Sequence, residues 1–258
     1  MKAIGLIAAL PQEIAPFLRQ AGQFERLRLG KFTAYSFRLP DLQGVLVRSG
    51  VGLKRALAAS RTLIAAARPD LLVSFGVAGS ARPGPQVGDV VIARAACLLE
   101  NAASIDSYFQ LAQLSAPARQ AVWDVLRPRQ ARLLSGVILT THGSQELPPL
   151  PAQFVNPLLD METAGIAQVA SSCSIPLLGL RAISDSVEHP LPFDLAMFYD
   201  QQQNLRLGRL VTMLIRHPRR LAQAMSFSQN VKLASENLAV ALFEALKYTD
   251  MLEHKQPG

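Results

Sequence analysis

The segment LLVSFGVAGS at residues 71–80 is the most informative part of this chain for its fold. It starts with the short apolar run Leu71–Phe75, which is typical of a strand buried on both faces. The small residues Gly76–Ser80 follow and predict a turn. A helical pattern lies before the segment and ends at Pro69-Asp70. The segment therefore predicts a helix followed by a buried strand, which is the repeating unit of α/β folds.

The same alternation continues on both sides of this segment. Further strands are predicted at 3–10, 32–38, 44–48, 90–93, 133–140 and 177–183. Helices are predicted from 11, over 53–68, 115–126, 161–172, 203–226 and 231–247, with a proline-rich loop at 141–157. This pattern predicts an α/β fold, a single-domain three-layer α/β/α architecture around a mixed, mostly parallel twisted sheet. No linker divides the chain, so we expect one domain over 1–258 with a C-terminal helical extension at about 203–250.

Composition excludes several classes of protein. Half of the 258 residues are hydrophobic and 17% are charged, which excludes global disorder. Cys97 and Cys173 lie far apart without a CxxC pattern, and the four histidines form no metal-binding spacing, so we expect no disulfide and no protein-bound metal. The apolar run Ala3–Leu10 faintly resembles a secretory signal, but Pro11 follows at once without a cleavage motif. We therefore expect a buried first strand and a cytoplasmic protein.

The net charge of +7 makes nucleic acid a partner to consider. The excess is concentrated in residues 201–235, which contain six bases and no acid, but no nucleic-acid motif accompanies them. We therefore expect no nucleic-acid binding. The simplest interpretation is a solvated helix face. The alternative is peripheral membrane contact through the basic amphipathic segment 205–220.

Ligands of α/β proteins bind outside the carboxyl ends of the strands. Three acidic residues are among those that this rule selects: Glu13, Glu162 and Asp185. The rule therefore predicts a site in which carboxylates carry the chemistry. Neither GxGxxG nor a Walker A pattern is present, which disfavours a dinucleotide or ATP site and leaves us expecting no cofactor.

Six motifs occur in the order found in one known family. They are LIAALPQE (6–13), SGVGLKRA (49–56), RPDLLVSFGVAGS (68–80), VGDVVIA (87–93), DMET (160–163) and LRAISD (180–185). With them the chain resembles the nucleoside phosphorylase/nucleosidase superfamily, and most of all the methylthioadenosine/S-adenosylhomocysteine nucleosidases and the hopanoid-associated nucleoside phosphorylases. The resemblance implies cleavage of a purine N-glycosidic bond, with 5′-modified adenosines as the expected substrates, and a homo-oligomer.

The resemblance also implies roles for residues near the ends of the last two motifs. Asp185 matches the acid that protonates the departing base, with Ser184 and Arg181 in supporting positions. Glu162 matches the residue that holds the ribose hydroxyls, and Met161 the residue that packs on the sugar. A carboxylate suits a vicinal diol because it accepts two hydrogen bonds at once.

On the other side of the bond, Glu13 matches the glutamate that positions the attacking water in the nucleosidases. The small residues of two neighbouring turns match substrate-binding positions, and they are Gly50, Gly52, Val77, Ala78 and Gly79. Two features of the phosphorylases are absent here: the phosphate-binding arginine before Gly76, and the hydroxyl that Val77 replaces. Both departures favour hydrolysis.

Other observations keep phosphorolysis open, with phosphate as the co-substrate. Arg48, Lys54 and Arg55 lie near the Ser49–Gly52 turn and are able to attract an anion. The base-binding segment falls at 140–144, where the match is poor, and Phe154 is a candidate for stacking on the base. A non-catalytic nucleoside- or lipid-binding module on the same fold is the second interpretation, but a module that only binds has no need of all three carboxylates.

Overall fold

The computed structural model describes residues 2–101, 104–141, 147, 149–185, 218–249 and 252–253. Within them the main sheet has the strand order β10-β9-β6-β11-β5-β1-β4-β3-β2, and β7 pairs with β6. The strands of this sheet are β1 (Lys2–Ala8), β2 (Phe24–Leu29), β3 (Phe32–Leu39), β4 (Leu42–Arg48), β5 (Leu71–Ser80), β6 (Val90–Asn101), β7 (Ser104–Gln110), β9 (Leu133–Thr140), β10 (Pro157–Asp160) and β11 (Leu177–Asp185). A separate pair joins β8 (Gln113–Leu114) to β12 (Leu252–Glu253).

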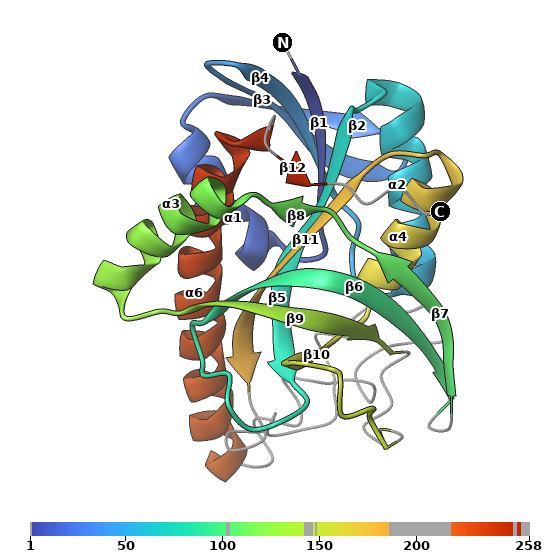
Figure 1. The fold of residues 1–258 in the computed structure, drawn as a ribbon. Coiled ribbons are helices and arrows are strands. Elements are labelled where there is room, and N and C mark those ends of the chain that lie inside the picture. Colours follow the sequence, from blue (N-terminus) through green and yellow to red (C-terminus); the bar gives the residue numbers. More distant parts are fainter. Residues whose placement is uncertain are drawn as a thin grey trace.

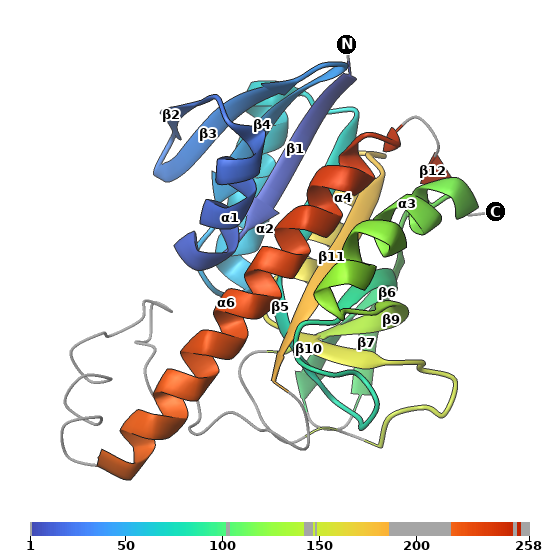
Figure 2. The ribbon, with the colours of Figure 1, turned by 90° about the vertical axis from the view of Figure 1, so that its left-hand side faces the viewer.

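Helices cover both faces of this sheet (Figure 1, Figure 2). They are α1 (Pro11–Ala21), α2 (Leu53–Ala67), α3 (Ala116–Leu126), α4 (Thr163–Ser172) and α6 (Pro218–Leu246), with a short 3-10 turn at Arg127–Arg129. One apolar cluster joins α1, α3 and α6 to the first face of the sheet, and a second joins α2 and α4 to the other face. The predicted three-layer α/β/α architecture is confirmed.

The sheet is mixed, with a parallel centre. β1 runs parallel to β4 and β5, β5 to β11, and β9 to both β6 and β10. The pairs β2–β3, β3–β4, β6–β7, β6–β11 and β5–β10 are antiparallel. The carboxyl ends of β1, β4, β5 and β11 consequently meet at one edge, and this edge holds the predicted site residues.

Three details of the chain differ from the sequence prediction. The predicted turn Gly76–Ser80 is the second half of β5, because β11 and β10 both continue to pair with it. The strands β2, β7, β8, β10 and β12 were not predicted; β8, β10 and β12 are short, and β2 mixes charged with apolar residues. The break predicted between two C-terminal helices at 227–230 is also wrong, since α6 is one continuous helix.

The segment 205–220, for which membrane contact was considered, lies mainly outside the described residues. Among the helices that the structure describes, none combines the length and apolar character needed to cross a membrane.

Candidate active site

Glu13 is fixed by the start of α1. Pro11 occupies the first helical position, where its missing N–H costs nothing. The Glu13 carboxylate turns back and accepts hydrogen bonds from the backbone N–H groups of Ala9 (3.0 Å), Leu10 (2.7 Å) and Val77 (2.9 Å). The side chain is buried, and burial raises the pKa of Glu13 despite these bonds. The structure therefore ties a carboxyl group to both β1 and β5.

The place of Glu13 depends on a glycine in β5. A Cβ atom at Gly76 would lie 2.6 Å from Oε1 of Glu13, so only glycine admits the carboxylate at this distance. This close approach explains why a glycine is needed inside a strand that is otherwise rich in large apolar residues.

Glu162 lies at the N-terminus of α4 and reaches the N-terminus of α2. Its Oε1 accepts a 2.7 Å hydrogen bond from the backbone N–H of Gly52, which has φ +103° and precedes α2. Burial and the nearby charges of Asp160 and Glu13 raise the pKa of Glu162 to about 8. A carboxyl group in this state readily gains or loses a proton near neutral pH.

Asp185 ends β11 and lies against β5. Ser184, which is buried, donates a 2.6 Å hydrogen bond to Oδ1 of Asp185. On the other side, a Cβ atom at Gly79 would lie 2.5 Å from Oδ2. Burial raises the pKa of Asp185, while the Ser184 hydroxyl opposes the rise. Asp185 is thus placed to hold a proton and give it away.

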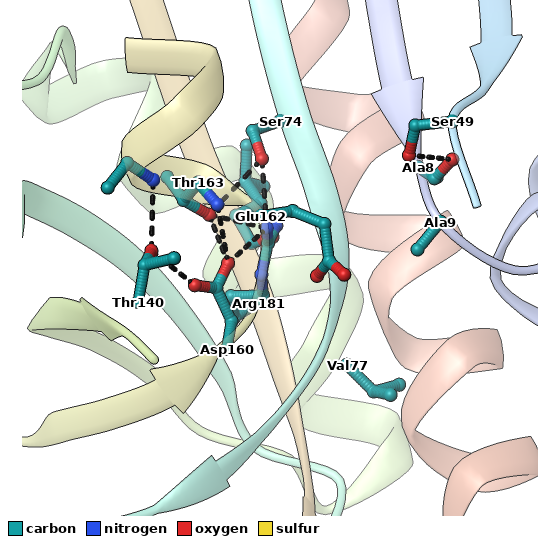
Figure 3. Close-up of polar contacts among 12 residues, drawn as sticks. Ala8, Ala9, Ser49, Ser74, Val77, Thr140, Asp160, Glu162, Thr163 and Arg181 are labelled. Atoms are coloured by element: carbon teal, nitrogen blue, oxygen red, sulfur yellow. Dashed lines mark hydrogen bonds and ion pairs between the residues drawn. The ribbon is translucent and has the colours of Figure 1, made fainter. Parts of the chain in front are cut away.

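Arg181 lies in a buried polar network rather than against Asp185. Its Nη2 donates to Asp160 (2.8 Å), Ser74 (2.9 Å) and Thr163 (2.5 Å), and its Nη1 donates to the carbonyl of Leu180 (2.8 Å). Figure 3 shows this network as one cluster, with the Glu162 carboxylate directed away from it. Arg181 therefore acts at the site through its charge and its partners.

A small cavity lies between Glu13, Glu162 and Arg181, and Asp185 is not among the described residues that line it. It is lined by residues at the ends of β1 and β4, in the middle of β5 and β11, and at the starts of α1 and α4, including Glu13, Ser49, Ser74, Val77, Glu162 and Arg181. Its volume of about 10 Å³ is close to what one water molecule requires. Glu13 and Glu162 thus face the same small space from opposite elements.

The other predicted positions have varied surroundings. The backbone N–H groups of Val77 and Gly52 bind the two glutamates, as described above. Met161 is partly exposed beside Glu162, and Ala78 is buried. Gly50 has φ +76°, and a Cβ atom there would lie 2.6 Å from Nη1 of Arg55. The structure therefore gives these residues backbone and packing roles at the edge of the site.

The structure describes only some of the residues that were predicted to bind the purine base, and it does not support all of those predictions. Phe154 is buried in an apolar cluster with Cys97 and Leu139, so the structure gives it a packing role and not an exposed stacking face. Thr140 donates a 2.6 Å hydrogen bond to Asp160. Residues 142–144 of the predicted base-binding segment lie outside the described residues.

Sequence reasoning missed the buried hydrogen-bond network that Asp160, Thr163 and Ser74 form with Arg181. Asp160 is the last residue of β10 and accepts a 3.0 Å hydrogen bond from the backbone N–H of Thr163, the first residue of α4. That pattern signals a helix cap. The bond to Arg181 spans 21 residues and has no local signal.

Comparisons with known proteins agree with this geometry. A family model described as the phosphorylase superfamily matches residues 3–216. The 5′-methylthioadenosine/S-adenosylhomocysteine nucleosidase of Baumannia cicadellinicola is 28% identical over 203 residues, covering 72% of this chain and 88% of that protein. The enzyme of the same name from Maridesulfovibrio salexigens is 25% identical over 199 residues, covering 71% and 86%.

Solved structures show the same fold. The nucleosidase of the same name from Neisseria meningitidis, in complex with methylthio-immucillin-A, superposes with a TM-score of 0.65 at 22% identity, covering 96% of this chain and 99% of that one. Futalosine hydrolase of Helicobacter pylori gives a TM-score of 0.67 at 19% identity, covering 95% and 97%. These likenesses identify the fold.

Proposed function

Because the chain belongs to the phosphorylase superfamily, we propose that it cleaves the N-glycosidic bond of a purine nucleoside by hydrolysis. The observation that carries this proposal is the placement of Glu13 at a cavity of the size of one water molecule, opposite Glu162. The nucleosidases named above, which share up to 28% identity over most of this chain, support the same reaction class.

Glu162 is assigned to the sugar. Its carboxylate accepts hydrogen bonds from the two ribose hydroxyls and stabilises the positive charge that develops on the ribose as the bond breaks. Gly52 holds one oxygen of this carboxylate in place through its N–H. Binding of the diol favours the ionised form of Glu162, whose pKa is about 8 without a ligand.

Glu13 and Asp185 are assigned to the two proton transfers. Water attacks the anomeric carbon and gives its proton to Glu13, while the C–N bond breaks and its electron pair passes to the base. Asp185 gives a proton to a nitrogen of the departing base, which leaves as a neutral molecule. A proton then returns from Glu13 to Asp185 through solvent, and the products are the free base and the free sugar, which keeps any 5′ substituent.

Burial of Asp185 serves this role because a general acid has to be protonated before it can donate. Ser184 holds one carboxyl oxygen, and Gly79 leaves space for the other. The proposed acid is therefore fixed on β11, and Glu13 is bound at the end of β1, on the other side of β5.

A 5′-modified adenosine is the proposed substrate class, since the nucleosidases that the chain resembles are named for such compounds. The test is release of adenine from methylthioadenosine, S-adenosylhomocysteine, adenosine and an adenosyl-hopanoid, each with and without phosphate. Release that needs no phosphate, with the free sugar as the second product, is the expected result. Strict dependence on phosphate with a ribose-1-phosphate product would overturn hydrolysis.

The same assay addresses the second interpretation. A chain that binds these nucleosides, as measured by calorimetry, but releases no base from any of them would be a binding module. A homo-oligomeric state and a cytoplasmic location stay predictions.

A further inference from the structure

The guanidinium of Arg181 is unusually placed for a charge beside a cavity. The residue is 2% exposed, and its two terminal nitrogens are engaged by four acceptors within its own network. Among the described residues that line the cavity, Arg181 is the single base. A buried cation at a cavity attracts anions unless another charge cancels it.

Asp160 supplies the cancelling charge. Its carboxylate accepts hydrogen bonds from the Thr140 hydroxyl (2.6 Å), the Thr163 hydroxyl, the Thr163 N–H (3.0 Å) and Arg181 (2.8 Å). Four bonds fill the acceptor capacity of a carboxylate. Asp160 is thereby held against Arg181 and is itself 7% exposed, so the pair is closed to solvent.

We propose that Asp160 is a positioning residue that selects the nucleophile: by cancelling the charge of Arg181, it keeps anions out of the cavity beside Glu13 and leaves the cavity to water. This inference rests on the proposed hydrolysis. It assigns the choice of water to a charge pair, in addition to the small size of the cavity. It also explains why two hydroxyls, one backbone N–H and the Arg181 guanidinium all donate to one acid, Asp160, which is not among the residues that line the cavity.

The variant that tests the proposal is Asp160→Asn. An asparagine oxygen in the place of Oδ2 keeps the bonds from Thr163 and Arg181, and its amide nitrogen faces the hydroxyl of Thr140. The change therefore removes the negative charge and preserves most of the geometry. Arg181 then loses its ion pair with Asp160, and the carboxyl groups that remain near it are those of Glu13 and Glu162 at the cavity.

Base release is measured against sodium formate, sodium chloride and sodium phosphate, with gluconate holding the ionic strength constant. The unmodified enzyme is expected to be insensitive to all three anions. Asp160→Asn is expected to be inhibited at least tenfold more strongly by formate and chloride than the unmodified enzyme, with phosphate weaker because of its size. Equal sensitivity of the two proteins to formate would overturn the proposal.

Two further variants separate charge from loss of structure. Asp89→Asn breaks another Asp–Arg pair, with Arg132, away from the cavity, and should gain no sensitivity to formate. Asp160→Asn/Arg181→Met removes both charges and should lose the sensitivity that the single variant gains. Persistence of formate inhibition in this double variant would also contradict the proposal.

Melting temperatures give a second measurement that does not require catalysis. Formate that binds only the folded state raises the melting temperature of Asp160→Asn and not that of the unmodified protein. If Asp160→Asn does not fold, folding of the charge-balanced double variant supports charge cancellation, and failure of both variants to fold overturns it. Loss of the proposed function would appear separately, as dependence of the unmodified enzyme on phosphate or as no release of base.

Discussion

Asp185 Oδ2 occupies the space beside Gly79 that a side chain would fill, since a Cβ atom at Gly79 would lie 2.5 Å away. The two residues are register partners on neighbouring parallel strands, at the bulge that ends the pairing of β11 with β5. The position of the proposed general acid is therefore set by the absence of a side chain on the strand next to it.

Gly79→Ala is expected to lower kcat at least a hundredfold, because displacement of a catalytic group by about 1 Å has an effect of this size. The measurement is kcat for base release alongside the melting temperature. Gly179→Ala is the matched control, since its Cβ would meet the flexible Leu111 side chain at 2.9 Å in the core of the sheet. It should reduce stability and leave kcat within a few-fold. Equal losses of kcat in both variants would contradict the role of Gly79.

Asp185→Asn is expected to slow release of adenine by about 10²–10⁴-fold, the usual contribution of a general acid. A riboside with a 4-nitrophenol leaving group needs no protonation to depart. If the enzyme accepts this riboside, the variant should cleave it nearly as fast as the unmodified enzyme does. Equal slowing for both leaving groups would show that Asp185 acts in some other way.

Glu13→Gln is expected to reduce hydrolysis by about 10²–10⁴-fold while a nucleoside still binds, because the base for water is removed and the sugar contacts stay. The glutamine amide nitrogen then faces at least one of the backbone N–H groups that donate to Glu13. Because two donors cannot form a hydrogen bond, the change costs about 1–3 kcal/mol of stability. Calorimetry with a non-hydrolysable analogue measures binding, and urea unfolding measures stability. Unchanged hydrolysis would remove Glu13 from the reaction.

The pKa of Glu162, raised from 4.5 to about 8, predicts how stability varies with pH in the absence of ligand. Folding favours the protonated form, so this contribution to the free energy of unfolding is complete below about pH 4.5 and is lost as the pH rises through 8. Glu162→Gln cannot ionise and should show a flatter profile between pH 5 and 9. Parallel profiles for the two proteins would mean that Glu162 is ionised throughout this range.

Much of this architecture was predictable because it depends on local patterns. Continuous apolar runs such as Leu71–Phe75 indicate strands buried on both faces, and the strand-end rule leads directly to Glu13, Glu162 and Asp185. The continuation of β5 through Gly76–Ser80 was not predictable locally. Its small residues resemble a turn, and pairing with β11 and β10 overrides that preference.

The missed part of the site depends on contacts between distant segments. Asp160 and Arg181 are 21 residues apart, and Arg181 and Ser74 are 107 apart. Each residue alone fits an ordinary local role, Asp160 as a helix cap and Ser74 as a small core residue. Only the folded sheet brings them together. The proposed role of Asp160, which is to cancel the charge of Arg181, therefore cannot be predicted from the sequence alone.

β5 sets the spacing between its contacts with Glu13 and Asp185. Its backbone N–H at Val77 binds Glu13, and two residues farther along Gly79 accommodates Asp185. At about 3.3 Å per residue, these two points are separated by about 7 Å along the strand. The repeat of an extended chain thus sets the spacing of the two points on β5 that hold the proposed base for water, Glu13, and the proposed general acid, Asp185. A one-residue insertion or deletion between Val77 and Gly79 would change that span by half and turn one of the two contacts to the opposite face of the sheet.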